Sequence, residues 1–179
     1  MDNQNKNNKE KFPKRKPMRL KGYDYSNVGA YFLTLCTEDR KNFFGKIVRE
    51  SLMTAPYVQL SPYGKVLLHQ IEEINHTYSH LQIDHFSIMP NHLHLIVTVY
   101  KNGSSGTPTP TSDVKYGSSG TPTPTNAVIS AFVSTLKRFT NQKAGVKLWQ
   151  RGYYDHILRD EDDYLRAWKY IEENPFGKE

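Results

Sequence analysis

Cysteine is nearly absent from this chain, since Cys36 is the one cysteine among 179 residues and no disulfide can form within the molecule. Cys36 lies in an apolar, strand-like run, so we expect a buried, unreactive thiol rather than a nucleophile. No apolar run approaches the roughly 20 residues of a membrane-spanning helix. No apolar segment typical of a secretory signal follows Met1. These absences predict a cytoplasmic protein without a membrane partner.

An excess of either charge is also lacking over most of the chain. Eight of the 24 basic residues but two of the 18 acidic ones lie in residues 1–22, so the rest carries 16 of each sign. Residues 1–22 are rich in Asn and Lys and are expected to form a disordered basic arm. Such an arm suits a polyanion such as nucleic acid, and a solubilising tail is the alternative. Its candidate DNA-binding residues are Lys14, Arg15, Lys16 and Arg19.

Apolar periodicity predicts the order of the elements from residue 23 onward. Strands are expected at 29–37, 81–89 and 92–100, with a shorter pairing segment within 40–50. A helix should begin with Ser61 as N-cap and continue to about Asn75. In the strand 81–89, simple alternation puts Ile83 on one face and both Phe86 and Ile88 on the other.

A repeated segment interrupts this pattern, because GSSGTPTPT occurs at 103–111 and again at 117–125. Two copies are too few for a repeat fold, and we expect a flexible insertion over 101–125. A second helix is predicted over 126–143. Its expected buried stripe is Val128, Phe132, Leu136 and Phe139. Lys137 and Arg138 lie toward its C-terminal end and are further candidates to bind DNA.

The last part of the chain predicts a strand at 153–158 and a helix that begins at Asp160, the expected N-cap, and runs to about Glu173. Pro175 should end that helix. The full order is β-α-β-β-α-β-α. It predicts an α+β fold over 23–179, with a ferredoxin-like antiparallel sheet, two helices on one face and an additional C-terminal helix.

Two histidines stand out in the strand 92–100. Because side chains alternate along a strand, His92 and His94 should point to the same side, roughly 6–7 Å apart. Leu93, Leu95 and Val97 then face the opposite side, as in a half-buried strand. A pair of imidazoles on a rigid strand can hold a divalent metal ion. The alternative is an ordinary surface or core-edge pair.

The C-terminal helix presents a second pair of polar side chains. Its core stripe should be Tyr164, Trp168 and Ile171. Tyr170 and Asn174 lie off that stripe and one turn apart. A site of His92, His94 and the Asn174 side-chain oxygen would suit Mg²⁺ or Mn²⁺ acting on a phosphate. In the alternative interpretation, Tyr170 is a boundary aromatic and Asn174 an ordinary helix terminator.

Two motifs carry a resemblance to a known family. Residues 88–96, IMPNHLHLI, resemble the HUH motif of the single-tyrosine HUH transposases. Residues 148–157, LWQRGYYDHI, followed by YIEENP at 170–175, resemble the REP-associated tyrosine transposase (RAYT) branch of that family. The resemblance covers about residues 22–175 without the repeated segment. It implies a catalytic domain that cuts and rejoins single-stranded DNA near hairpin-forming repeats.

The resemblance also implies roles for individual residues. Tyr170 would be the nucleophile that forms a 5′-phosphotyrosine, and His92 and His94 would act with it as catalytic metal ligands. Asn174 would be the third ligand to Mg²⁺ or Mn²⁺. Arg151, Tyr154 and His156 would shape or line the site, with Arg151 a further candidate to contact DNA. The alternative for these three residues is a role in packing and strand pairing.

The same resemblance implies single-stranded or hairpin DNA as partner, no small-molecule organic cofactor, and a location in the bacterial cytoplasm in association with the nucleoid. The protein would be a monomer or a homodimer, with the monomer preferred. Two alternatives stay open. One is a domesticated hairpin-binding protein without cleavage activity. The other is an unrelated metal-dependent hydrolase, which is disfavoured because no further motif supplies the missing ligands.

Overall fold

The computed structural model describes residues 29–51, 54–100 and 127–174. Its elements, in chain order, are β1 (Gly29–Cys36), the 3₁₀ turn η1 (Glu38–Arg40), β2 (Gly45–Val48), β3 (Tyr57–Leu60), α1 (Pro62–Thr77), β4 (Leu81–Met89), β5 (His92–Val99), α2 (Ala127–Ala144), β6 (Tyr154–Leu158) and α3 (Glu161–Glu173). The predicted basic arm and the repeated insertion lie outside the described residues.

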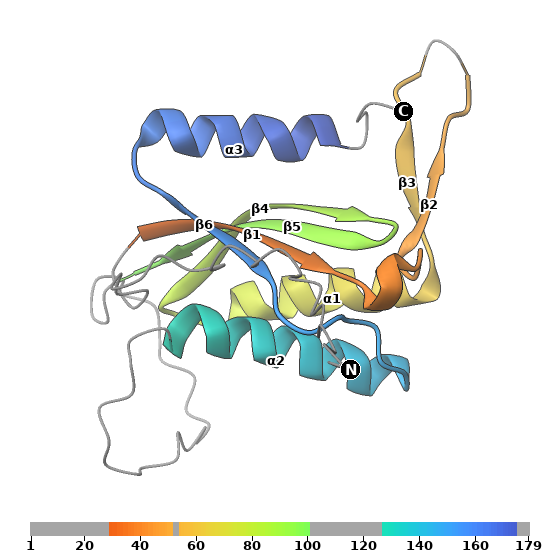
Figure 1. Ribbon diagram of the computed structural model, residues 1–179, viewed down its shortest axis with the longest axis horizontal. Coiled ribbons are helices and arrows are strands. Elements are labelled where there is room, and N and C mark those ends of the chain that lie inside the picture. The colour runs from red at the N-terminus through yellow and green to blue at the C-terminus, as the bar shows by residue number, and fades with distance from the viewer. Residues whose placement is uncertain (1–28, 52–53, 101–126, 175–179) are drawn as a thin grey trace, which may run out of the picture.

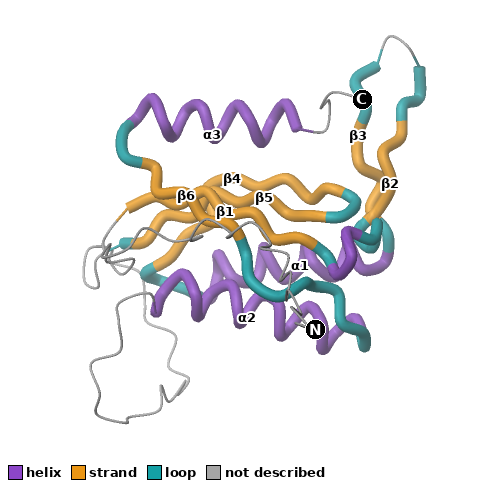
Figure 2. Tube along the Cα trace, in the orientation of Figure 1, coloured by secondary structure: helices purple, strands orange, loops and turns teal. Residues whose placement is uncertain are grey.

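The main sheet has the strand order β4-β5-β1-β6, with every neighbouring pair antiparallel. Helices α1 and α2 cover one face of this sheet, and α3 crosses the other (Figure 1). The tube view shows the same three layers of helix, strand and helix (Figure 2). The α+β prediction of an antiparallel sheet with two helices on one face and an additional C-terminal helix is therefore confirmed.

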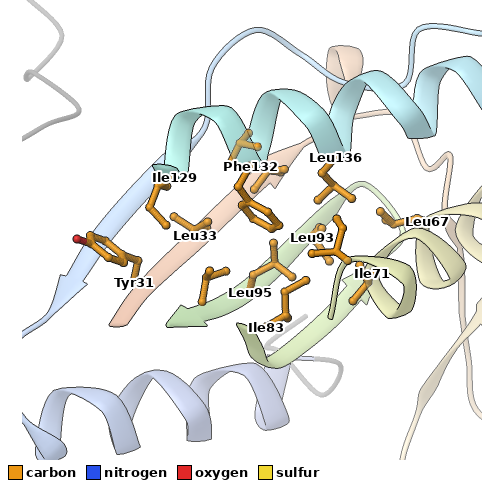
Figure 3. Close-up of a cluster of buried hydrophobic side chains, with 14 of the residues drawn as sticks. Tyr31, Leu33, Leu67, Ile71, Ile83, Leu93, Leu95, Ile129, Phe132 and Leu136 are labelled. Atoms are coloured by element: carbon orange, nitrogen blue, oxygen red, sulfur yellow. The ribbon is translucent and has the colours of Figure 1, made fainter. Parts of the chain in front are cut away.

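The larger core lies between the sheet and the α1–α2 layer. Leu93, Leu95 and Val97 alternate along β5 and belong to this core, as do Phe132 and Leu136 of α2. Figure 3 shows Leu93 and Leu95 on the side of the sheet that Phe132 and Leu136 cover. All five side chains are at least 98% buried. Each contributes about 1.5–3 kcal/mol through removal of apolar surface from water, so this layer supplies most of the driving force for folding.

A second, smaller core lies under α3. Ile96 of β5, Leu158 of β6 and Ile171 of α3 are buried there, with Phe32 and Trp168 packed beside them. The expectation of a half-buried β5 strand was therefore wrong. The face of β5 that carries the histidines is covered by α3, and the hydrophobic stripe of that helix provides the cover.

A β-bulge in β4 overturns the predicted facing of its apolar residues. The register with β5 shifts between Ile83 and His85, so Asp84 is an extra residue and Ile83, Phe86 and Ile88 all face the larger core. Asp84 turns instead toward α3, where it accepts hydrogen bonds from Thr98 and from the Tyr164 hydroxyl. The pKa of Tyr164 is raised to about 12, mainly by burial and to a smaller extent by the negative charge of Asp84.

Two further sequence predictions need correction. The segment 40–50 does contain a pairing strand, β2, but its partner β3 was not predicted, and the two form a separate hairpin. Phe139 was assigned to the buried stripe of α2, yet it is 39% exposed. Thr140 is buried in its place, because its hydroxyl accepts a hydrogen bond from the Trp149 indole and donates to the Leu136 carbonyl.

The predicted starts of α1 and α3 are confirmed. Ser61 caps α1 by accepting from the Gly64 amide, with Pro62 in the first turn. Asp160 caps α3 by accepting from the Asp163 amide at 2.8 Å. Both caps satisfy amide groups that the first helical turn leaves without partners. No described helix is long and apolar enough to cross a membrane.

Candidate active site

The two histidines lie side by side near the start of β5, on the face that α3 covers. Antiparallel pairing with β1 puts His92 opposite Cys36 and His94 opposite Thr34. The two imidazole centroids are 4.6 Å apart. His94 also stacks on Phe32 of β1, with centroids 5.3 Å apart. The spacing of the two histidines on a strand therefore produces the shared face that the sequence predicted.

Hydrogen bonds hold one nitrogen of each ring. His94 Nδ1 lies 2.9 Å from the Thr34 hydroxyl, and His92 Nδ1 lies 2.7 Å from the Asn91 side-chain oxygen. When these Nδ1 atoms donate, both Nε2 atoms carry lone pairs that can accept a hydrogen bond or bind a metal ion. His94 Nε2 is buried and has no hydrogen-bond partner. A buried nitrogen without a partner is costly in a folded protein, and a bound metal ion would satisfy it.

Both rings are held in the neutral form that metal binding requires. The pKa of His94 is lowered to about 3, mainly because the ring is buried and in addition because His92 lies beside it. Burial and then the positive charge of Arg40 lower the pKa of His92 to about 4. At neutral pH the lone pairs are therefore not taken up by protons.

Helix α3 brings Tyr170 over these rings. Ile171 anchors the helix in the smaller core and is 1% exposed. The adjacent Tyr170 therefore falls on the flank of the helix, where its ring meets His94 edge-on with centroids 5.3 Å apart. It also meets Phe32 edge-on at 5.8 Å. Tyr170 nevertheless remains 51% exposed, so a large substrate can reach its hydroxyl.

Asn174 lies at the end of α3, one turn after Tyr170. Its Nδ2 is 3.4 Å from His92 Nε2. A 180° rotation of the side-chain amide would put its oxygen where its nitrogen now lies. Asn174 would then offer an oxygen ligand to a metal ion beside His92 in place of a hydrogen-bond donor. In the described part of the chain, no group of three or more His, Cys, Asp or Glu side chains could hold a metal ion. A metal here would therefore need Asn174 beside His92 and His94, a mixed nitrogen and oxygen set that divalent cations such as Mn²⁺ accept.

These side chains share one open pocket with a volume of about 750 Å³. It lies where α3 ends over the start of β5. Among the described residues, two arginines contribute to the wall and no aspartate or glutamate does. Twelve residues line it: Phe32, Thr34, Cys36, Arg40, His92, His94, Gln150, Arg151, Tyr153, Tyr154, Tyr170 and Asn174. A positive wall without carboxylates favours an anionic ligand.

The other residues singled out from the sequence are more dispersed. Arg151 and Tyr154 line the pocket, whereas His156 lies outside it and pairs with Asp163 at 3.0 Å. The Lys137 ammonium donates to the backbone carbonyls of Gln150, at 2.9 Å, and Gly152. Arg138 is exposed and lies over the Phe139 ring. Lys14, Arg15, Lys16 and Arg19 lie outside the described residues.

Sequence reasoning missed Arg40 and Thr34 as parts of the site. Thr34 alternates with the buried residues of β1 and therefore lies on the other face of the strand. A predicted pairing of this strand with the histidine strand could have identified Thr34 as a neighbour of His94. Arg40 had no comparable signal. It reaches the pocket because η1 turns the chain back at the end of β1.

Comparison with known proteins agrees with this fold. No model of a protein family matches the chain. An uncharacterized protein of Haemophilus influenzae is 31% identical over 164 residues, which are 90% of this chain and 88% of that protein. Among solved structures, a REP-associated tyrosine transposase bound to a REP hairpin is similar with a TM-score of 0.52 and 19% identity. That likeness covers 83% of this chain and 67% of the transposase, and it shows a shared fold.

Proposed function

This chain belongs to the same protein family as the Haemophilus influenzae protein and has the fold of a REP-associated tyrosine transposase, and from this we propose that it is a transposase-like enzyme. Its proposed reaction is metal-dependent cutting and rejoining of single-stranded DNA beside hairpin-forming repeats. The REP-associated tyrosine transposase with a similar fold is bound to a REP hairpin, which supports DNA as the partner. The proposed setting is the bacterial cytoplasm, in association with the nucleoid, and the proposed working form is a monomer.

One observation carries the proposal. Tyr170 and Asn174 come from the last helix and His92 and His94 from a strand about 80 residues earlier, yet all four line one pocket. The Tyr170 ring lies 5.3 Å from that of His94, and Asn174 lies within 3.4 Å of His92. An accessible hydroxyl beside neutral imidazoles is the arrangement that nucleophilic attack on a phosphodiester needs.

In the proposed reaction, the Tyr170 hydroxyl oxygen attacks the phosphorus of a phosphodiester. The bond between phosphorus and the 3′ oxygen breaks, the phenol proton is lost to solvent, and the departing 3′ oxygen takes a proton. The products are a 5′-phosphotyrosine and a free 3′-OH. Because the covalent link keeps the energy of the broken bond, another 3′-OH can reverse the reaction and join a different end.

The chain's own residues position this reaction. His92, His94 and Asn174 are the proposed holders of Mg²⁺ or Mn²⁺, which would supply charge stabilisation at the phosphate oxygens. Thr34 keeps the His94 ring oriented, and Phe32, which stacks on His94, meets the Tyr170 ring edge-on beside it. The two pocket arginines provide the positive wall against which a phosphate can rest.

Covalent capture tests the proposal. The protein is incubated with Mn²⁺ and labelled single strands that flank a hairpin, and the mixture is run on a denaturing gel. We expect a labelled band at the mass of protein plus DNA for wild type and none for Tyr170→Phe. Tyr154→Phe is the matched control, because Tyr154 lines the same pocket and is equally exposed at 51%.

Each other result points elsewhere. An adduct that survives Tyr170→Phe would refute the nucleophile. Tight hairpin binding without any adduct would favour the domesticated DNA-binding protein. Equal adduct formation by wild type and His92→Ala across a series of Mn²⁺ concentrations would refute the metal site.

A further inference from the structure

The turn η1 follows β1 directly and has an unusual backbone. Asp39 and Arg40 are consecutive non-glycine residues with positive φ, at 52° and 56°. This left-handed region is sparsely populated by residues with a side chain. Such a conformation persists only where the surrounding structure holds it, and residues in it are found preferentially at functional sites.

Contacts on two sides hold the turn in place. On one side, Thr37 bonds to the Asn91 carbonyl through both its amide, at 3.0 Å, and its hydroxyl, at 2.9 Å, next to the metal-site histidine. On the other, the Glu38 amide donates to the Leu148 carbonyl at 2.8 Å. The Glu38 carboxylate also pairs with Lys147 at 2.8 Å. The turn is thus tied to the two segments that lead into the pocket residues His92 and Gln150.

Arg40 lines that pocket, and its charge is not neutralised by the acidic residues beside it. Glu38 pairs with Lys147, and Asp39 pairs with Lys41 at 3.3 Å. In the described part of the chain, no ion pair includes Arg40. Arg40 and His92 both line this pocket, so the charge of Arg40 lies at the proposed metal site.

We propose that Arg40 is a substrate-binding residue of the reaction proposed above, on which this inference rests, and that its guanidinium holds the non-bridging oxygens of the phosphodiester to be cut. A guanidinium fits two phosphate oxygens in a bidentate pair and cannot lose its charge. On the pocket wall beside His92, it faces the charge that develops as Tyr170 attacks. The strained turn keeps the guanidinium there before the DNA arrives.

The test measures DNA binding without cutting. A fluorescent 20-nucleotide oligothymidine is titrated with Tyr170→Phe protein in EDTA, and anisotropy gives Kd over a series of salt concentrations. Adding Arg40→Gln should weaken binding about tenfold at low salt. It should also reduce the slope of log Kd against log salt by about 0.7, the value for one lost phosphate contact on a single strand. Arg40→Lys should restore the slope.

Two controls separate this role from a structural one. Arg159→Gln removes an exposed arginine at the opposite end of α3 and should change neither affinity nor slope. Arg40→Gly relieves the positive φ and should raise Tm by about 2–4 °C while it weakens DNA binding as Arg40→Gln does. A merely structural Arg40 would not move stability and binding in opposite directions.

The failures are distinguishable. If the Tyr170→Phe parent binds the oligothymidine and Arg40→Gln binds it with the same affinity and slope, the role of Arg40 is refuted and the proposed function stands. If the parent does not bind single-stranded DNA at all, the proposed function itself fails and the role of Arg40 fails with it.

Discussion

Replacing His94 with glutamine should reduce the loss of stability that the protein suffers at mildly acidic pH. The His94 imidazole is 4% exposed, and burial together with His92 lowers its pKa to about 3 from an ordinary 6.5. In the unfolded chain the ring takes up a proton as the pH falls below 6.5, whereas the folded protein stays neutral there. The unfolded state therefore binds more protons, and stability falls between pH 6.5 and about 3.

The magnitude follows from that pKa shift. Each pH unit below the unfolded pKa costs about 1.4 kcal/mol, so His94 alone should account for about 2 kcal/mol of the stability lost between pH 7 and pH 5. His92, whose pKa is lowered to about 4, contributes in the same direction but less, because it is partly exposed.

Urea denaturation in EDTA at pH 7, 6 and 5 measures this loss. Wild type should lose about 2 kcal/mol more than His94→Gln, whatever the absolute stability of the variant. His76→Gln, at an exposed position of α1, is the control and should behave as wild type. If wild type and His94→Gln lose stability in parallel, within about 0.5 kcal/mol, His94 is not held neutral by burial and the argument for a ready metal ligand fails.

Three other outcomes test the charge of the pocket and the packing beneath it. Mn²⁺ should bind the oligothymidine complex at least about tenfold more tightly than the free protein, because the pocket has two arginines and no carboxylate and a phosphate supplies the missing negative charge; electron paramagnetic resonance titration measures both affinities, and equal values would contradict this. Leu95→Ala should lower the free energy of unfolding by about 2–5 kcal/mol in urea, and Leu165→Ala, at a 56% exposed position, by less than about 0.5 kcal/mol; similar losses would show that the core is misassigned. Gly64→Ala should cost about 1–3 kcal/mol because the new Cβ would collide with the Phe44 carbonyl oxygen, and an unchanged Tm would count against that contact.

Local pattern predicted most of the elements, and particular residues show why it stopped short. The period of two in β5 and the caps at Ser61 and Asp160 depend on neighbouring residues, so they could be predicted from the sequence. The bulge at Asp84 could not, because it depends on hydrogen bonds from Thr98 and Tyr164, which lie elsewhere in the chain. Without the bulge, Ile83 and Phe86 would face opposite sides of the sheet.

The strand β3 and the exposed position of Phe139 were missed for a related reason. A four-residue strand in a hairpin has too short a pattern to distinguish from a loop. On α2, Phe139 and Thr140 are adjacent, and hydrophobicity alone favours the phenylalanine. The Trp149 indole reverses this choice, since its hydrogen bond to Thr140 satisfies both polar groups inside the core.

For the candidate site, the sequence by itself determined two rigid pairs. Residues two apart on a strand must share a side, which sets His92 beside His94, and residues four apart on a helix must stack, which sets Tyr170 beside Asn174. Only the tertiary structure decided that the two pairs meet. They meet because α3 buries Ile171 against Ile96 on the histidine face of the sheet, and because η1 turns Arg40 into the same pocket. Both depend on packing between segments far apart in the chain, which local periodicity does not encode.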